Sequence, residues 1–510
     1  MTVTNKTEEA PGGAPVIRAR RLGLFTQDDV IVLMRSDCHL CRAEGLAARS
    51  RVLLSSARGE VIATLYQVEN DWLAEHEAAL SEAAWARLGL AEGEPLQIRQ
   101  APPVPSFGDV RRRIYGGRLD ARAFTAIVSD ISGGRYSDIH LATFLSACSA
   151  LPLDRDEMIH LTRAMVNAGD RLSWPTSPVV DKHCVGGLPG NRTTPIIVAI
   201  VASLGLVMPK TSSRAITSPA GTADVMETLA PVDLDLARMR RVVEAEGACL
   251  AWGGAVHLSP ADDILIRIER ALDIDTEGQL VASVLSKKIA AGATHVVFDL
   301  PVGPSAKVRS PEAARSLSEN LSAAAAAFGL RSRCVITDGS QPIGRGLGPA
   351  LEARDVLAVL QNAAAAPEDL RERALALAGA ALELAGTARE GEGRAMALRA
   401  LVSGQAWAKF QRICEAQGGM RVPPRAPLTR VWPARGSGRL ARIDNRKISR
   451  LAKLTGAPDD KAAGVELHVR LSDAIAAGQP LLSLHAEAEG RLDYAMEYAL
   501  ANLDMFELES

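Results

Sequence analysis

The sequence lacks any apolar run long enough to cross a membrane. Its most apolar stretch, residues 196–207, is about 12 residues long, whereas a membrane-spanning helix needs about 20. A buried helix is expected there instead. Residues 1–15 are polar and contain Gly and Pro but no apolar secretion signal, which predicts a disordered tail. These absences predict a cytoplasmic protein without a membrane partner.

The chain also lacks a surplus of charge. Its formal net charge is -2, which argues against a general attraction to nucleic acid. Seven cysteines in 510 residues do not resemble a secreted disulfide framework. Cys38 and Cys41 form an isolated CxxC motif. Because no second ligand pair is nearby, we expect structural cysteines and no metal, with zinc and redox roles as the alternatives.

The order of periodic segments predicts an α/β fold class built from several parts. These parts are a small N-terminal mixed α/β or β-rich domain (16–100), a helical subdomain (107–175, with 260–291), an α/β domain with a mostly parallel sheet (176–259 and 292–422) and an α+β C-terminal domain (425–510). In the first domain, alternating strand-like runs accompany a charged helical piece near residues 72–88.

Local signals support the helical and α/β assignments. Asp120 can cap a helix whose apolar residues recur at positions 124, 127, 128 and 131. Segments 295–300 and 333–337 are expected to be buried strands, and between them Ser310 opens a helix that Gly329 ends. Strands alternating with helices indicate a mostly parallel sheet.

The stretch DKHCVGGLPGNRTT, residues 181–194, has the composition of a backbone cradle for an anion. Gly186, Gly187 and Gly190 let the backbone approach a ligand closely and point its N–H groups inward. Lys182 adds a full positive charge, and paired threonines begin the next helix, where the dipole favours an anion. Phosphate or a phosphate ester is the expected ligand. The alternative is a Gly-rich turn with a solvated lysine.

A second loop, KTSSRAITSPAGTAD at residues 210–224, repeats this chemistry ahead of another helix. Its candidate donors are Ser212, Ser213, Arg214, Thr217, Ser218 and Thr222. The arginine could form a two-pronged contact with phosphate, although Ser and Thr are also common helix caps.

A third segment, residues 266–288, carries Ser283 and Lys287 one helical turn apart on the same face. Asp275 stands just before that helix. Such a pair, with a carboxylate close by, could bind a nucleobase and donate a proton. Ordinary polar surface residues are the alternative.

The ordered motifs DKHxxGG, SxRxxxxxxGTxD and ASxLxKK resemble those of the thymidine/pyrimidine-nucleoside phosphorylases. The resemblance covers roughly residues 107–500. Within this family, the chain is most similar to the longer branch with an extra N-terminal domain, which includes archaeal AMP phosphorylases. An anthranilate-phosphoribosyltransferase-like activity is a weaker alternative that rests on fold analogy.

The resemblance implies a set of site residues. The implied phosphate-binding residues are Lys182, Cys184, Gly187, Thr194, Ser212 and Thr222. The implied base-reading residues are His183, Ser283, Lys287 and either Arg267 or Arg270. The AMP-phosphorylase branch adds Asp275 as proton donor and nucleotide contacts from Gly187, Ser213, Arg214, Ala215, Ile216, Thr217, Ser218, Thr222, Ser283 and Lys307. Asp275, Lys182 and His183 are then the catalytic candidates.

The implied reaction is phosphorolysis, in which phosphate attacks the anomeric carbon of a nucleoside and releases the base. Inorganic phosphate is the co-substrate, no metal or organic cofactor is expected, and the family resemblance implies a homodimer or a larger homo-oligomer. The transition state should resemble an oxocarbenium ion, which a fixed phosphate dianion stabilises. Proton donation assists the departing base.

Two departures from the family pattern bear on the substrate. Cys184 stands where the family usually has Ser, and a thiol is the weaker hydrogen-bond donor. Lys307 stands where the short thymidine enzymes have an aromatic residue, and it could neutralise a nucleotide 5'-phosphate. The expected activity is thymidine phosphorolysis. The alternatives are phosphorolysis of AMP or another nucleoside 5'-monophosphate, and a non-catalytic phosphate- or nucleotide-binding protein.

Overall fold

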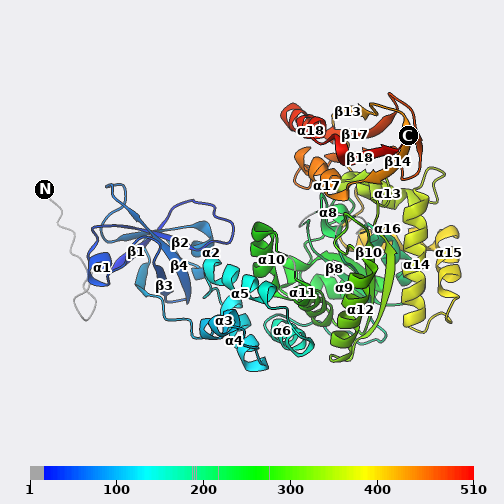
Figure 1. Ribbon diagram of the computed structural model, residues 1–510. Helices are drawn as coiled ribbons and strands as arrows, with labels where there is room; N and C mark the ends of the chain where they lie inside the picture. The colour runs from blue at the N-terminus through cyan, green and yellow to red at the C-terminus, as the bar shows by residue number, and fades with distance from the viewer. Residues whose placement is uncertain are drawn as a thin grey trace. The chain divides into compact units, whose positions relative to one another are not determined.

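The computed structural model describes residues 16–186, 188, 190, 192–215, 218–274 and 276–509 (Figure 1). The chain divides into two compact units. One contains residues 16–111 together with residues 130–141. The other contains residues 112–129 and the chain from residue 142 onward. Among the described residues, no helix is both long enough and apolar enough to cross a membrane.

The first unit is built on a closed six-stranded barrel with the order β1-β5-β2-β4-β3-β6. Its strands are β1 (Ile17–Arg21), β2 (Ile31–Arg35), β3 (Arg51–Ser56), β4 (Gly59–Val68), β5 (Glu77–Leu80) and β6 (Pro95–Gln100). Apolar side chains such as Val32, Met34 and Leu54 fill the interior. Of the two predicted alternatives for this region, mixed α/β and β-rich, the barrel corresponds to the second.

One element of the first unit was predicted wrongly. Residues 77–80 were assigned to a charged helical piece, but they form β5, and the helix α2 covers only Glu82–Leu88. The strand forms because Ala78, Ala79 and Leu80 are buried in the barrel, where β5 pairs with β1 and β2. Tertiary pairing thus overrides the helical tendency of alanine and leucine.

Cys38 and Cys41 are buried in the barrel unit as free thiols. The Cys38 sulfur caps the short helix α1 (His39–Ala43) by accepting the Cys41 N–H at 3.1 Å. Burial, together with the neighbouring Cys38, raises the pKa of the Cys41 thiol to about 12. A protonated, buried thiol is a poor nucleophile and metal ligand, so the geometry fits structural cysteines.

Helices α3 (Phe107–Ile114), α4 (Ala121–Ser132), α5 (Asp138–Ala150) and α6 (Arg155–Asn167) follow the barrel in the chain. Asp120 caps α4 as predicted, accepting the Ala123 N–H at 2.8 Å. In the second unit, α10 (Pro260–Leu272) and α11 (Glu277–Ala290) pack on α6. Residues 260–291 thus lie against one helix, α6, of the predicted helical subdomain.

The α/β part of the second unit contains parallel strands in the order β11-β10-β7, with a parallel pair β8-β9 beside them. These strands are β7 (Val180–Cys184), β8 (Met208–Ser212), β9 (Ala248–Trp252), β10 (His295–Val302) and β11 (Arg331–Asp338). A parallel bridge between Val179 and Val207 links the two groups. The predicted mostly parallel sheet is thus confirmed.

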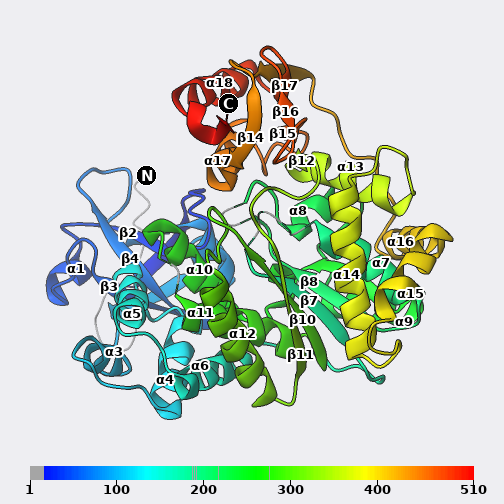
Figure 2. The ribbon, with the colours of Figure 1, turned by 45° about the vertical axis from the view of Figure 1, so that its right-hand side comes forward.

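Figure 2 shows helix α12 (Pro311–Ala326) and helix α14 (Glu368–Leu384) on opposite sides of these strands. Ser310 caps α12 as predicted, but the helix ends at Ala326, before Gly329. Strand β11 was predicted to be buried, and this was wrong: it is the edge strand, and most of its residues are partly exposed. An edge strand has a neighbour on only one side, so its apolar pattern overstates its burial.

The C-terminal part contains two small sheets, β12-β15-β17-β13 and β16-β14-β18. Their strands are β12 (Gly346–Leu347), β13 (Leu428–Pro433), β14 (Gly438–Ile443), β15 (Gly464–Leu467), β16 (Ala474–Ile475), β17 (Pro480–Ala486) and β18 (Phe506–Glu509). Helices α17 (Asn445–Leu454) and α18 (Glu489–Ala501) complete the predicted α+β arrangement. Because β12 directly precedes α13 (Pro349–Leu360), the first sheet is continuous with the α/β part.

Candidate functional site

Strand β7 positions the first three candidate residues, Lys182, His183 and Cys184. The sequence analysis placed them in a loop, but they belong to the carboxyl end of the strand. Lys182 is completely buried, and its Nζ donates to Thr193 Oγ1 at 2.8 Å. The Thr193 hydroxyl in turn donates to the Gly190 carbonyl at 2.9 Å. The ammonium group is therefore fixed between the strand and the N-terminus of helix α7 (Thr193–Ser203).

Asp299 on β10 is the counter-ion that the sequence analysis missed. One of its oxygens, Oδ2, lies 3.5 Å from Lys182 Nζ, and the other accepts the Thr337 hydroxyl at 2.6 Å. Both Lys182 and Asp299 are fully buried. The available signal was an acidic residue inside the apolar run HVVFDL, since a charge in a buried strand requires a partner.

Cys184, the last residue of β7, packs against Gly190 in the segment between β7 and α7, which we call the phosphate loop after its predicted ligand. A Cβ atom added to Gly190 would lie 3.3 Å from Cys184 Sγ, so a side chain at this position would require a small shift of its neighbours. Burial, and next the charge of Asp299, raises the pKa of the Cys184 thiol well above its usual value. The thiol therefore stays protonated and keeps a weak S–H donor for an anion. Gly187, the third glycine of this stretch, lies outside the described residues.

A buried cluster of charges lies behind the loop. Asp181 lies 3.1 Å from Lys210 Nζ on β8 and 2.8 Å from Lys288 Nζ on α11. Two lysines thus share one carboxylate, so the cluster has an excess positive charge whenever both lysines are protonated. Burial lowers the pKa of Lys210 to about 7, although Asp181 opposes this effect. Sequence reasoning missed this cluster. The available signal was the presence of one lysine in each of two otherwise buried segments.

His183 is surrounded by these lysines. Its pKa is far below the usual value, first because of burial and then because of Lys288, Lys210 and other lysine charges. The imidazole is therefore neutral near pH 7. It can accept or donate a hydrogen bond to a nucleobase, but as a neutral ring it is a weak source of protons.

The second loop is organised by Asp224 at the start of helix α8 (Thr222–Glu227). Its Oδ2 accepts the N–H groups of Ala215 at 2.6 Å and Gly221 at 2.9 Å. These bonds fold the loop back against the helix N-terminus. Ser212 ends β8 with its hydroxyl buried and without a hydrogen-bond partner in the described parts of the chain.

Arg214 does not point its guanidinium at an open anion site. Its Nη1 and Nη2 each donate to the Glu227 carboxylate at 2.8 Å. Nη1 also donates to Asp224 Oδ1 at 3.3 Å. The guanidinium carbon also lies 4.8 Å from the Trp252 ring centre. The two-pronged contact expected with phosphate is therefore made with Glu227.

The remaining candidates of this loop have different surroundings. Ser218 is buried and donates to the Ala220 carbonyl at 2.8 Å, and the Ser213 carbonyl accepts the Ala223 N–H. Thr222 and Thr194 are buried in the first turns of α8 and α7. Ile216 and Thr217 lie outside the described residues.

The third segment forms its own polar cluster between α10 and α11. Asp262, a fully buried residue that sequence reasoning missed, accepts the Ser283 hydroxyl at 2.9 Å and lies 2.7 Å from Lys287 Nζ. Asp263 lies 3.3 Å from the same nitrogen. Although burial alone would lower it, the pKa of Lys287 is raised by these two carboxylates.

The expected pairing of Ser283 with Lys287 is therefore mediated by Asp262. Arg267 and Arg270 lie exposed on α10, and Asp275 lies outside the described residues. The Lys288–Asp181 ion pair joins α11 to β7 and so connects the third segment to the phosphate strand. A Cβ on Gly186 would lie 3.1 Å from Lys307 Cβ, which places Lys307 beside the phosphate loop.

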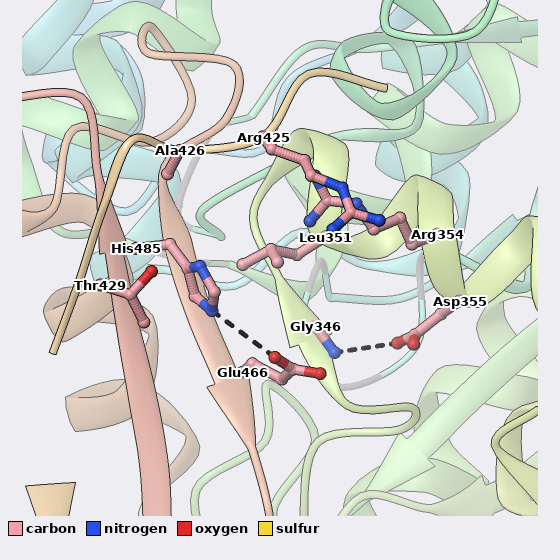
Figure 3. A pocket seen from close by; sticks show the side chains of 9 residues that line it. All are labelled: Gly346, Leu351, Arg354, Asp355, Arg425, Ala426, Thr429, Glu466 and His485. Carbon is pink, nitrogen blue, oxygen red and sulfur yellow. Dashed lines mark hydrogen bonds and ion pairs between the residues drawn. The ribbon is translucent and has the colours of Figure 1, made fainter. Parts of the chain in front are cut away.

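A separate cavity of about 330 Å³ lies between α13 and the first C-terminal sheet (Figure 3). Arg354 and Arg425 lie side by side in it, and His485 faces Glu466 at 3.5 Å. Its lining contains none of the candidate residues from the three sequence segments. This cavity is therefore distinct from the candidate site. Among the described residues, no cluster of three or more His, Cys, Asp or Glu side chains could hold a metal ion.

Three domain families match this chain. Residues 110–169 match the glycosyl transferase family helical bundle domain, residues 176–407 the α/β domain of that family, and residues 439–505 the pyrimidine nucleoside phosphorylase C-terminal domain. The crystal structure of anthranilate phosphoribosyltransferase from Thermus thermophilus is similar in fold, with a TM-score of 0.52 and 22% identity. That similarity covers 60% of this chain and 98% of that one.

Relatives of nearly full length are more informative. A protein of Chelativorans sp. (strain BNC1) named "Putative thymidine phosphorylase" is 63% identical over 97% of this chain and 98% of its own. A protein of the same name from Tolumonas auensis is 61% identical over 95% and 96% of the two chains. These full-length relatives and the three matching domains show that the chain belongs to the thymidine/pyrimidine-nucleoside phosphorylase family.

Proposed function

We propose that the protein is a nucleoside phosphorylase that converts thymidine and phosphate into thymine and 2-deoxyribose 1-phosphate. The observation that carries this proposal is the buried Lys182 ammonium, held at the N-terminus of α7 by Thr193 and beside Asp299. A buried cation at a helix N-terminus is a strong anion site. The names of the full-length relatives support thymidine as the substrate.

In the proposed mechanism, the phosphate dianion binds against Lys182, the hydroxyls of Thr194, Ser212 and Thr222, and the thiol of Cys184. One phosphate oxygen attacks the anomeric carbon as its bond to the base nitrogen breaks. The bound dianion stabilises the developing oxocarbenium ion, and its fixed position supplies proximity. The electron pair of the broken bond stays with the base.

The departing base gathers negative charge. The positively charged lysines on that side of the site stabilise this charge. Lys287 is held protonated by Asp262 and Asp263, so it can donate a hydrogen bond to an anionic base oxygen. The neutral His183 provides a further hydrogen-bonding group. Asp275 is proposed as proton donor from the family resemblance alone. No step in this scheme uses a metal or an organic cofactor.

The test is chromatographic measurement of free base after incubation with inorganic phosphate. Thymidine, uridine, AMP, CMP and UMP are compared in parallel, with reactions lacking phosphate as controls. Phosphate-dependent release of thymine is the expected result. Absence of base release from all five compounds would contradict the proposed activity.

A second candidate substrate is a nucleoside 5'-monophosphate such as AMP. The observation in its favour is the lysine content of the site. The pKa of His183 is lowered first by burial and then by the charges of Lys288, Lys210, Lys182 and Lys307. Asp181 and Asp299 offset only part of that charge. An additional phosphate group would therefore be attracted, and we propose Lys307, which lies beside Gly186, as the residue that binds it.

Replacing Lys307 separates the two candidates. In Lys307→Ala, we expect kcat/KM for nucleoside monophosphates to fall about 10- to 100-fold, because a charge-assisted contact worth roughly 1.5–3 kcal/mol is lost. Turnover of thymidine should change by less than about threefold. Steady-state kinetics on thymidine and AMP provide the measurement. Equal losses on both substrates would remove the proposed contact with a 5'-phosphate.

We also propose a cytoplasmic homo-oligomer. The balanced charge of the chain and the family resemblance support this proposal. At the end of α3, Ile114 and Tyr115 are 52% and 89% exposed, which supplies apolar surface for contacts between subunits. Light scattering coupled to size-exclusion chromatography measures the assembly directly, and a strict monomer would contradict it.

A further inference from the structure

Arg373, on helix α14, reaches the phosphate loop from outside the three sequence motifs. A Cβ atom built on Gly190 would lie 3.4 Å from Arg373 Nη1, 3.3 Å from Cys184 Sγ and 3.5 Å from Asp299 Oδ2. A guanidinium group and the carboxylate that faces Lys182 therefore both lie close to this loop glycine. Arg373 Nη2 donates to the Asp338 carbonyl at the end of β11, which anchors the side chain in this position.

The placement of Asp299 creates an electrostatic problem for a phosphate site. Its Oδ2 lies 3.5 Å from Lys182 Nζ and has no hydrogen-bond donor in the described parts of the chain. A carboxylate this close offsets the ammonium charge and repels an incoming dianion. In a buried environment such an effect extends over several ångströms, because few water molecules screen it.

Arg373 supplies the missing opposite charge. Its Nη1 is buried and, within the described residues, also lacks a hydrogen-bond partner. The effects on Cys184 support this proximity, since Asp299 raises the pKa of the thiol and Arg373 lowers it. Lys182, Arg373 and Asp299 together carry two positive charges and one negative charge, so this cluster has a net positive charge.

We propose that Arg373 is a positioning residue for phosphorolysis: it neutralises Asp299 and thereby leaves the charge of Lys182 available to inorganic phosphate. This inference rests on the proposed phosphorylase function and names a residue outside its motifs. The positive charge of Arg373 would compensate in part for the weak attraction of the Cys184 thiol for phosphate. Arg373 should therefore affect the affinity for phosphate. The proposed nucleoside-binding residues on α10 and α11 form a separate cluster around Asp262.

Three variants test the role of this charge. Arg373→Gln removes it, Arg373→Lys keeps it, and Arg371→Gln is the matched control on the same helix, where Arg371 lies 3.6 Å from Glu368. We expect Arg373→Gln to raise the KM for phosphate about tenfold, with the KM for thymidine within about twofold of wild type. Arg373→Lys should recover most of the loss, and Arg371→Gln should behave as wild type.

A double variant distinguishes neutralisation of Asp299 from other effects. If Arg373 acts through Asp299, then adding Arg373→Gln to Asp299→Asn should change the KM for phosphate by less than about twofold. A full tenfold effect in the Asp299→Asn background would overturn the proposal. So would an Arg373→Gln variant with an unchanged KM for phosphate, or one in which the KM values for phosphate and thymidine rise equally.

Calorimetric titration with inorganic phosphate alone separates this inference from the proposed function. Wild type that binds phosphate but turns over no nucleoside would contradict the proposed activity, while weaker binding to Arg373→Gln would still support the role of Arg373. Equal phosphate affinity of wild type and Arg373→Gln would overturn that role, whatever the activity of the protein.

Discussion

Lys182→Ala is expected to lower kcat/KM for phosphorolysis by about 10²- to 10³-fold. This range is the usual cost of removing one preorganised group that stabilises charge in a transition state. Lys182 is fully buried and fixed by Thr193, so water cannot easily supply a replacement cation. Initial rates of base release at several phosphate concentrations measure the loss, which should include a higher KM for phosphate.

The control for this variant must address folding, because Lys182→Ala leaves Asp299 without its ion pair. Circular dichroism and the melting temperature show whether the variant remains folded. The double variant Lys182→Ala/Asp299→Asn removes the unpaired carboxylate and should restore stability without restoring activity. Lys447→Ala, which removes a surface lysine paired with Asp504, should leave activity unchanged. Near-normal turnover of Lys182→Ala would refute the phosphate site.

Asp181→Ala is expected to have the largest effect on stability, with a loss of about 3–5 kcal/mol near pH 7. This is the usual cost of breaking a buried ion pair, because the remaining charge has no partner. Here Lys210 and Lys288 would both lose the carboxylate that they share at 3.1 and 2.8 Å. Chemical denaturation, compared with wild type, measures the loss.

The pH dependence of this variant has a defined sign. Burial lowers the pKa of Lys210 to about 7 in the wild type, and losing Asp181 lowers it further. Unfolded lysines titrate near pH 10.4, so between these limits the unfolded chain binds more protons than the folded one. Stability therefore rises with pH in this window, and more steeply in the variant.

Raising the pH from 7 to about 9.5 should thus narrow the difference in melting temperature between Asp181→Ala and wild type. Asp181→Asn tests charge at nearly constant volume and should show the same trend. The exposed Glu312→Ala, which removes a surface pair with Arg315, is the control and should melt like wild type at both values. A difference that widens with pH would contradict the assignment of buried, charged lysines.

The sequence predicted those features that depend on local signals. The cap at Asp120, the start of α12 after Ser310 and the three motif segments are each encoded within a few residues. The parallel sheet followed from the alternation of strands and helices. In contrast, the strand at residues 77–80 depends on pairing with β1 and β2, and the exposure of β11 depends on its position at the sheet edge.

The partners of the candidate residues could not be predicted in the same way. Asp299 lies more than 100 positions from Lys182 in the chain, and Lys288 also lies more than 100 positions from Asp181, so no spacing rule joins either pair. Arg214 shows the opposite case. Its motif suggested a phosphate contact, whereas Glu227, only 13 residues away, binds its guanidinium. Residue type indicated charge but could not specify which charges meet.

The most direct test of the central claim is ³¹P nuclear magnetic resonance of wild-type protein incubated with thymidine and inorganic phosphate. We predict a new phosphate-ester signal from 2-deoxyribose 1-phosphate, which grows in step with free thymine and is nearly absent from Lys182→Ala. Thymine release without this signal would indicate hydrolysis, and no release under any phosphate concentration would leave thymidine without a role. Either result would contradict phosphorolysis at the Lys182 site.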